Sequence, residues 1–401
     1  MRILLINQTF YPDVTATGQY LTDLALELAK KEENVTVLTA ARGYEPPHHR
    51  LLNVETYRGI HIVRVWPFKF NRTNRFLRIL DAACVNAAFT FKLLQLPKFD
   101  RIVALTSPPL VGWTAAIVSR WKKAKFIYWL MDINPDEAIE AGWIGKNSLY
   151  AHFLDWVLKM TLHRSHKILC LDRYMRERIA AKAGNPSENI FILPPWAHDE
   201  ELETIPHEFN KFRKEFNLEG KFVVMYAGNH SICHPLGTLL EAAALLGHDS
   251  SIQFLFIGDG ERTSEVSAFK HRRHLSNITQ IPYQTRSDLK FSLSAADLHA
   301  VVMGDNYVGI VHPSKIYGVL TIGRPFVYIG PPDSHVMEII KKDGIGYETR
   351  HGQPEKLVEI IKRAAALTQQ EKQEIMSWEK KTAAKFSQAR LCGELTNLIT
   401  T

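Results

Sequence analysis

The residues with the clearest chemical potential lie in the stretch His312–Pro331, which reads HPSKIYGVLTIGRPFVYIGP. Pro313 is pre-shaped for a helix start, and Ser314 is a residue type that caps one. Lys315 follows directly, although a helix N-terminus is already electropositive and favours anions. The stretch therefore predicts a helix start where Lys315 and free backbone amides share a phosphate. The alternative is a solvated lysine on a surface helix.

A second motif joins an apolar strand to a helix through a polar loop, YAGNHSICHPLGTLLEAA at residues 226–243. Gly228 would let the backbone approach a ligand closely, because glycine carries no Cβ. Asn229, His230 and His234 offer hydrogen-bond donors beside the coming helix. An ordinary turn between strand and helix is the alternative.

A third strand ends in Gly258-Asp259-Gly260, within FLFIGDGERTSEV. This turn is common in α/β folds and is weak evidence by itself. It does not fit the GxGxxG fingerprint of dinucleotide-binding proteins, and the chain has no Walker lysine motif.

In the first half of the chain, the loop Thr9–Gln19 is long for a connection between strand and helix, and Gly18 precedes the next helix. Asp132 ends another strand, in WLMDINPDEAIEAG, where a carboxylate could orient a hydroxyl group. Acids in the first turns of a helix also have a purely electrostatic role. We therefore expect Asp132 to be functional and Glu140 to be structural.

Several other chemistries find no support in the sequence. There is no HExxH, no Asp-x-Asp and no GxSxG motif, so a metal site is not expected. The four cysteines are far apart, which indicates reduced core residues and a reducing compartment. The N-terminus does not read as a signal peptide, and no segment is long enough to cross a bilayer.

Positive charge is concentrated in one region. Residues 58–125 contain thirteen Lys or Arg against two acids, whereas the whole chain has a net charge of +7. Within that region, Phe68, Phe70, Phe76, Leu77 and Leu80 alternate with Lys69, Arg72, Arg75 and Arg78. That mixture suits an anionic membrane surface, and equally an amphipathic helix with a solvated basic face.

Short apolar runs alternate with amphipathic helical stretches along the whole chain, which is typical of parallel α/β units. Leu193–Leu202, LPPWAHDEEL, interrupts this rhythm and reads as a domain junction. We expect two doubly wound domains facing across a cleft, at 1–196 and 197–376. A C-terminal helix, at 377–401, is expected to cross back to the first domain.

In order and spacing, these motifs resemble the retaining GT-B glycosyltransferases of family 4, and most of all the bacterial enzymes that build surface polysaccharides. The resemblance rests on FYPDVTATGQYLTDLALELA, YAGNHSICHPLGTLLEAA, FLFIGDGE, SAADLHAVV and HPSKIYGVLTIGRPFV. It covers nearly the whole chain. It implies two Rossmann-like domains, the second holding a nucleotide-sugar, with no cofactor or metal.

The resemblance also implies roles for particular residues. Asp132 and Lys315 would be catalytic, the first near the donor sugar and the second on the leaving diphosphate. Backbone near Pro282–Gln284 would meet the base, and Gly18 would lie close to the reacting phosphate. The implied donor-binding residues are Gly18, Gly228, Asn229, His234, Gly258, Pro282, Tyr283, Arg286, Ser314 and Lys315.

The chain departs from the family pattern at two places. Where many relatives carry Arg and Lys after the first strand of the second domain, this chain has Asn229 and His234. Where relatives carry a ribose-binding Glu, it has Ile310 and Gly318.

We therefore expect a retaining transferase that uses a nucleoside-diphosphate sugar, with UDP favoured, and a lipid-linked or polysaccharide acceptor. It would be cytoplasmic or peripheral at the inner membrane face, without nucleic acid as a partner. A nucleotide-sugar 2-epimerase and a catalytically weakened scaffold are the alternatives.

Overall fold

A computed structural model describes residues 1–13, 15–41, 51–66, 75–184, 188–197 and 202–401. The chain divides into two compact units. The N-terminal unit comprises Met1–Pro195, Gly309–His312 and Ala389–Thr401, and the C-terminal unit comprises Trp196–Val308 and Pro313–Gln388. No disulfide links the four cysteines, all of which lie within the described residues.

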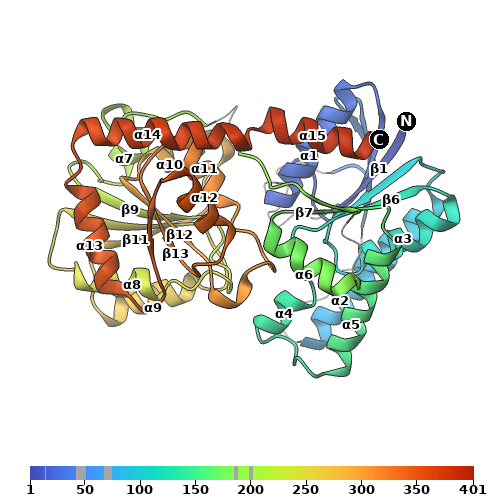
Figure 1. Cartoon of the computed structure of the whole chain (residues 1–401), viewed down its shortest axis with the longest axis horizontal. Helices are drawn as coiled ribbons and strands as arrows, with labels where there is room; N and C mark the ends of the chain where they lie inside the picture. The colour runs from blue at the N-terminus through green and yellow to red at the C-terminus, as the bar shows by residue number, and fades with distance from the viewer. Residues whose placement is uncertain (14, 42–50, 67–74, 185–187, 198–201) are drawn as a thin grey trace. The chain divides into compact units, whose positions relative to one another are not determined.

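In the described part of the N-terminal unit, eight strands form one sheet in the order β3-β4-β2-β1-β5-β6-β7-β8 (Figure 1). All neighbours are parallel except β3 and β4, which form an antiparallel pair. Central strands are apolar on both faces because helices cover both sides of a parallel sheet. The strands are β1 (Arg2–Ile6), β2 (Asn34–Ala40), β3 (Val54–Tyr57), β4 (Ile60–Val65), β5 (Arg101–Ala104), β6 (Lys125–Trp129), β7 (Lys167–Cys170) and β8 (Ile190–Ile192).

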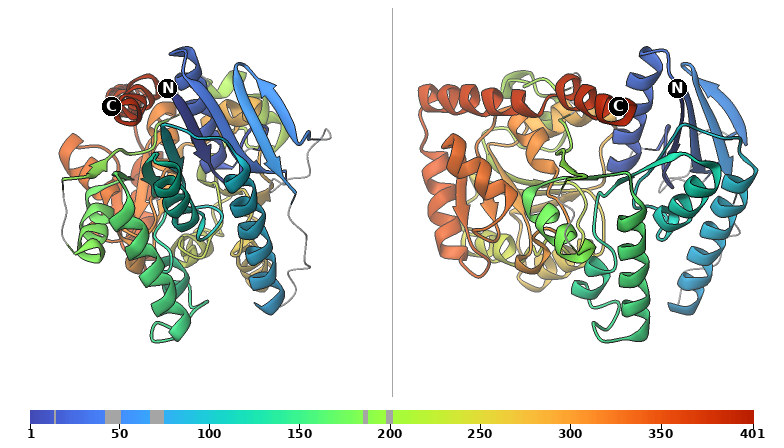
Figure 2. Two further views of the ribbon diagram at one scale, coloured as in Figure 1. Left: turned by 90° about the vertical axis from the view of Figure 1, so that its right-hand side faces the viewer. Right: turned by 45° about the vertical axis from the view of Figure 1, so that its right-hand side comes forward.

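The helices of this unit connect successive strands, apart from the last one, which ends the chain. Figure 2 shows the C-terminal helix lying beside α1, and Lys31 Nζ donates to Asn397 Oδ1 at 3.0 Å there. Arg101 and Lys167 also donate to carbonyl oxygens in its last turn. The helices are α1 (Ala16–Lys30), α2 (Arg75–Gln95), α3 (Val111–Lys122), α4 (Asp136–Glu140), α5 (Leu149–Arg164), α6 (Arg173–Ala183) and α15 (Gln388–Thr400).

The C-terminal unit has a six-stranded parallel sheet within the described residues, in the order β11-β10-β9-β12-β13-β14. The strands are β9 (Phe222–Ala227), β10 (Ile252–Ile257), β11 (Ile278–Ile281), β12 (Leu298–Val302), β13 (Phe326–Ile329) and β14 (Tyr347–Thr349). Its helices are α7 (Lys211–Glu215), α8 (Gly237–Leu245), α9 (Thr263–Arg272), α10 (Leu289–Ser294), α11 (Lys315–Ile322), α12 (His335–Asp343), α13 (Pro354–Ala365) and α14 (Gln369–Ala383).

Alternate residues of β9 enter two different cores, as the twofold repeat of a strand requires. Val224 and Tyr226 pack with α8 and α13 on one face, whereas Val223 and Met225 pack with α7 and the end of α10 on the other. The sheet is therefore buried on both faces, and its loops at the carboxyl ends of the strands are left to bind ligands.

The structure corrects two expectations about the elements. The helix expected from residue 377 is two helices, α14 and α15, separated by a 3-10 turn at Ala384–Phe386. The return to the N-terminal unit accordingly begins at Ala389 rather than at residue 377. Two short strands, β3 and β14, were not expected, because their half-exposed sequences carry little apolar signal.

Candidate functional site

Two glycine turns meet at the carboxyl ends of β9 and β10. The amide of Gly228 donates to Ile257 O, and that of Gly258 donates to Ile281 O, both at 2.9 Å. Both glycines have positive φ angles, 121° and 125°, which other residues rarely adopt. A Cβ added to Gly258 would lie 2.1 Å from Gly228 O. The two backbones therefore pack directly against each other, and glycine is required at both positions.

Lys315 lies against this pair of turns. A Cβ added to Gly228 would be 3.4 Å from both Cε and Nζ of Lys315. The ammonium donates to Tyr226 Oη at 2.6 Å and lies 3.9 Å from the centre of the Tyr226 ring. Tyr226 in turn donates to Asn229 O at 2.8 Å. Lys315, Gly228 and Asn229, which were predicted to share a site, lie together here, and Tyr226, which was not predicted, links them.

The ammonium of Lys315 is only weakly stabilised as a charge. Burial lowers the pKa of Lys315 to about 7. Across the described residues, no carboxylate forms an ion pair with it. An anion that entered the site would raise the pKa of Lys315 again, because an opposite charge nearby favours the protonated form.

Two histidines border the same cluster without adding charge to it. Burial, and then the positive charge of Lys315, lower the pKa of His230 to about 4. The same two causes, in the same order, hold the pKa of His234 well below its ordinary value. The Tyr226 ring packs against His230, with ring centroids 5.3 Å apart. Near pH 7 both imidazoles are therefore neutral, and protonated Lys315 supplies the positive charge beside them.

Tyr283 packs against the second glycine turn. Its hydroxyl donates to Asp259 O at 3.2 Å, and its ring would be 3.4 Å from a Cβ on Gly258. The backbone carbonyl of Pro282 accepts from the Gln284 side chain at 2.9 Å. Tyr283 thus reaches the cluster. A role for Pro282 in holding a base stays a prediction, and so does the contribution of Arg286, which begins a 3-10 turn at Arg286–Asp288.

The start of α11 differs from the expectation in one respect. The Ser314 side chain makes no capping hydrogen bond, because the residue has helical angles, φ −59° and ψ −19°, rather than the extended angles of a cap. The predicted cap is therefore wrong. The amides of Ile316 and Tyr317 donate to Pro313 O and Ser314 O. Within the described residues, this leaves the amides of Ser314 and Lys315 to meet a ligand.

Asp132 lies in the N-terminal unit, just after β6. It is bridged by backbone to Val311, and its Oδ1 accepts from Asn134 Nδ2 at 3.3 Å. Burial raises the pKa of Asp132, and hydrogen bonds from Thr106 and Asn134 oppose that rise. Asp132 is therefore a carboxyl group with an increased tendency to hold a proton, as a residue that exchanges protons or hydrogen bonds with a hydroxyl would be.

The residues just before Pro313 belong to the N-terminal unit. Ile133 N donates to Ile310 O at 2.9 Å, and Ile310 is fully buried. His312 Nδ1 lies 2.8 Å from Asp172 Oδ2 in a buried pair. Asp172 also caps α6 by accepting from the amide of Met175. The His312–Asp172 pair was not predicted. Its one sequence signal is that Asp172 follows a strand at a position typical of a helix cap.

Gly18 has a structural explanation in this fold. It is the third residue of α1, and an added Cβ would be 2.9 Å from Thr15 Oγ1 and 3.2 Å from Thr9 Oγ1. Those hydroxyls bond to each other at 2.8 Å. Glycine thus allows the preceding loop to fold onto the helix. Its expected position near a reacting phosphate stays a prediction.

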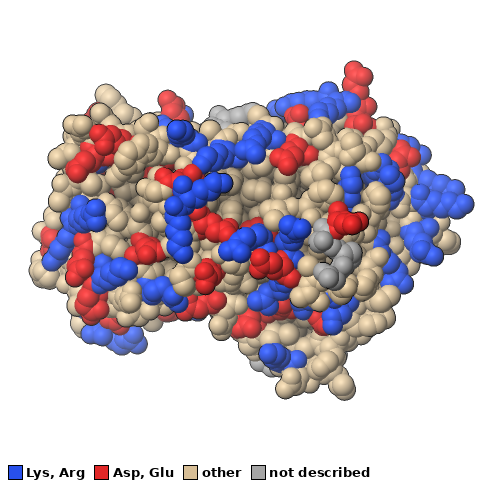
Figure 3. All heavy atoms as spheres, in the orientation of Figure 1, with Lys and Arg blue, Asp and Glu red and all other residues tan. Residues whose placement is uncertain are grey.

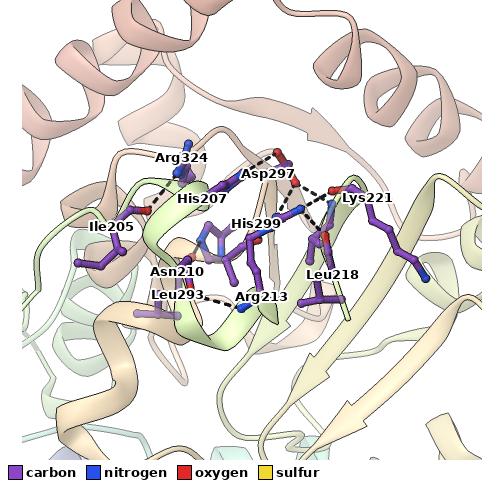
Figure 4. A network of polar contacts seen from close by, with 12 residues as sticks. Ile205, His207, Asn210, Arg213, Leu218, Lys221, Leu293, Asp297, His299 and Arg324 are labelled. Carbon is purple, nitrogen blue, oxygen red and sulfur yellow. Dashed lines mark hydrogen bonds and ion pairs between the residues drawn. The ribbon is translucent and has the colours of Figure 1, made fainter. Parts of the chain in front are cut away.

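A second group of residues with shifted pKa values is structural. Figure 4 shows Arg213 donating to backbone carbonyls, among them that of Leu218, and to Asp297 Oδ2 at 3.1 Å. Burial lowers the pKa of His207 and of His299 to about 4. These groups join the start of the unit to the amino ends of β9 and β12, opposite the ends that carry the glycine turns. We assign them to folding.

Comparison with known proteins agrees with this fold. Residues 15–196 match the glycosyl transferase 4-like domain family. The chain is 22% identical over 365 residues to the probable glycosyltransferase WbjE of Pseudomonas aeruginosa, covering 90% of this chain and 88% of WbjE. It is 24% identical over 340 residues to the putative colanic acid biosynthesis glycosyl transferase WcaI of Escherichia coli K12, covering 80% and 82%.

Solved structures show the same architecture. HepE from Anabaena, crystallised with UDP-glucose, superposes with a TM-score of 0.73 at 18% identity, over 100% of this chain and 99% of HepE. The two units therefore have the fold of the GT-B glycosyltransferases. The family match over the N-terminal unit and the two relatives together support a glycosyltransferase.

Proposed function

We propose that this glycosyltransferase moves a sugar from a nucleoside-diphosphate sugar, with UDP favoured, to a lipid-linked or polysaccharide acceptor in cell-surface glycan synthesis, and that it retains the anomeric configuration. The names of WbjE and WcaI support the surface-glycan context. The UDP-glucose bound in the HepE crystals supports the choice of donor.

The observation that carries the proposal is the surrounding of Lys315. A partly buried ammonium lies beside two glycine turns and the start of a helix, and within the described residues it donates to a phenol rather than to a carboxylate. Such an arrangement binds a diphosphate well, because ammonium and backbone amide groups all donate to phosphate oxygens. Because Asn229 and His234 are neutral, Lys315 supplies most of the positive charge that balances the diphosphate.

The chemistry follows from this charge balance. As the bond between sugar and diphosphate breaks, negative charge grows on the leaving oxygen. Lys315 and the amides at the start of α11 stabilise that charge, so they bind the transition state more tightly than the ground state. In a front-face substitution the leaving diphosphate takes the proton of the incoming hydroxyl group. Asp132 would orient that hydroxyl or the donor sugar.

We propose that no cofactor or metal takes part in this step. In the described ranges, no group of three or more His, Cys, Asp or Glu side chains is arranged to hold a metal ion. Lys315 would supply the positive charge that a divalent ion supplies in other transferases. Full activity in the presence of a chelator is the corresponding expectation.

We propose that the protein is cytoplasmic and peripheral at the inner face of the plasma membrane. In the described residues, no helix is long and apolar enough to span a bilayer. The basic excess of residues 58–125 supports attraction to anionic lipids. The sequence also suggested membrane attachment through a mixture of aromatic and basic side chains. The structure does not describe these side chains, which are at positions 68, 69, 70, 72, 75, 76 and 78.

Thermal unfolding with UDP in EDTA tests the donor site. A saturating ligand that binds only the folded state raises the melting temperature, by about 2.7 kcal/mol of stabilisation at a hundred times Kd. We expect an upward shift for the wild type, no shift for Lys315→Ala, and a full shift for Lys356→Ala, an exposed lysine on α13. No shift with any nucleoside diphosphate would contradict the proposal.

Turnover assays separate the alternatives. A 2-epimerase would convert the donor sugar without an acceptor, whereas a weakened scaffold would bind the donor and transfer nothing. The proposed transferase requires both substrates, and its product should keep the anomeric configuration of the donor, which NMR of the product reports.

A further inference from the structure

The start of α5 exposes a group of large apolar side chains on the N-terminal unit. Leu149 is 92% exposed, and Tyr150, Phe153 and Trp156 are each about half exposed. Trp143, in the loop before the helix, is 47% exposed. We call these five residues the aromatic cluster. Monomeric proteins expose single apolar residues routinely, but a contiguous group of this kind marks an interaction site.

Three members of the cluster form one continuous surface. Leu149, Phe153 and Trp156 are spaced by four and three residues, so they lie on one side of the helix. The rings of Phe153 and Trp156 stack with centroids 6.2 Å apart. Trp156 also meets Trp113 of α3 edge-on at 6.5 Å. At the bottom of Figure 3, the surface over the first turns of α5 is mostly uncharged.

Charge around the cluster favours an anionic partner. Between Gly142 and Arg164 the chain has Lys146, Lys159 and Arg164 against one acid, Asp155. Lys159 and Lys182 both pair with that acid, so these charges offset one another, and Lys146, exposed in the loop before α5, adds positive charge beside the cluster. Helices α2 and α5 both follow parallel strands and therefore begin at the same edge of the sheet. Their first turns point to the same end of the unit in Figure 2.

Tryptophan and tyrosine with nearby lysines suit the interface of a lipid bilayer. Their rings bury an apolar body at the level of the headgroups while the polar tip stays hydrated, and lysine meets lipid phosphate. We propose that the aromatic cluster inserts into the headgroup region of an anionic membrane and anchors the N-terminal unit there. This inference rests on the proposed membrane attachment and assigns it to a surface other than residues 68–80.

Vesicle flotation of the full chain tests the anchor. Vesicles of phosphatidylcholine with about one third phosphatidylglycerol are compared with phosphatidylcholine alone. The test variant is Leu149→Ser with Trp156→Ser. The control is Leu245→Ser with Trp378→Ser, which removes a half-exposed leucine and a half-exposed tryptophan from the C-terminal unit. Melting temperature and its shift by UDP confirm that each variant is folded.

We expect the wild type and the control to bind anionic vesicles at low salt, and the test variant to bind at least about tenfold more weakly. Brominated lipids should quench tryptophan fluorescence in the wild type and the control much more than in the test variant. Equal binding by all three proteins would overturn the assignment of this surface while leaving membrane attachment intact.

Two other results would also overturn the inference. If the wild type ignores anionic vesicles, the proposed membrane attachment falls together with the anchor, although the UDP shift could still stand. If the wild type sediments as a dimer, the test variant as a monomer, and neither binds vesicles, the aromatic cluster is an interface between copies of this chain.

Discussion

At the scale of single residues, the account depends on how Lys315 is held. A phenol and an aromatic ring hold the ammonium in place, but they stabilise its charge far less than a carboxylate would. The pKa of Lys315 is therefore near 7, and the group can change charge under ordinary conditions. A diphosphate binds the protonated form, so donor binding should take up a proton.

This predicts a pH-dependent affinity for UDP. Between pH 7 and pH 9 the fraction of protonated Lys315 in the free protein falls, so Kd should rise by up to about tenfold for each pH unit. The second ionisation of phosphate, near pH 6, is nearly complete above pH 7 and contributes little. Titration calorimetry at several pH values measures the Kd of UDP. A flat profile in the wild type, or the same slope in Lys315→Ala, would contradict the prediction.

The sequence indicated some of these residues for sound local reasons. The sequence pattern predicts turns at Gly228 and Gly258 and a helix start at Lys315, because residue types at such positions depend on the local backbone geometry. Tyr226 could not be found in this way, because its contact with Lys315 joins residues 89 positions apart. The Ser314 cap failed because a Pro-Ser pair does not determine whether the serine is extended or already helical.

At the scale of elements, α14 contains a feature that no local pattern indicated. Glu379 is fully buried, and neither carboxylate oxygen has a hydrogen-bond partner among the described residues. Burial raises its pKa well above the ordinary value of 4.5. The folded chain therefore holds a proton on Glu379 that the unfolded chain releases at neutral pH, so this group lowers stability as the pH rises.

Glu379→Gln should therefore stabilise the protein at pH 8 and change little near pH 4.5. The gain should grow by about 1.4 kcal/mol for each pH unit between 4.5 and the raised pKa. Urea unfolding at several pH values measures the difference in the free energy of unfolding between the variant and the wild type. Glu374→Gln, at an exposed position of the same helix, is the control and should show no such trend. A constant difference between Glu379→Gln and wild type would be incompatible with a buried, protonated carboxyl group.

Strands and helices were largely predictable because both sheets are mainly parallel and are buried on both faces. Runs such as RILLI and IQFLFI are apolar throughout, which is typical of strands covered on both faces. The missed strand β3, VETY, alternates between exposed and half-buried residues and pairs only with its neighbour β4. Such a hairpin at the sheet edge has no strong hydrophobic signal.

At the scale of the whole molecule, the chain is not two consecutive domains. Gly309–His312 and Ala389–Thr401 belong to the N-terminal unit although they follow most of the C-terminal unit in sequence. The first return depends on the buried His312–Asp172 pair and the second on contacts of α15 with α1. Both are long-range contacts, which explains why sequence patterns indicated only an approximate boundary near residue 196.

Hydrogen exchange of the full chain should locate donor binding. UDP should slow amide exchange in three peptides of the C-terminal unit, covering residues 226–236, 256–262 and 313–322, because the proposed diphosphate contacts lie there. Lys315→Ala should abolish this protection. If UDP protected only peptides of the N-terminal unit, such as residues 130–140, the donor site would be misplaced.

A crystal structure of the UDP complex tests the central claim most directly. We predict diphosphate oxygens within about 3 Å of Lys315 Nζ, with the ammonium turned from Tyr226 toward them and the backbone of Gly228 close by. A complex in which Lys315 still contacts Tyr226, while the diphosphate binds elsewhere, would contradict the account.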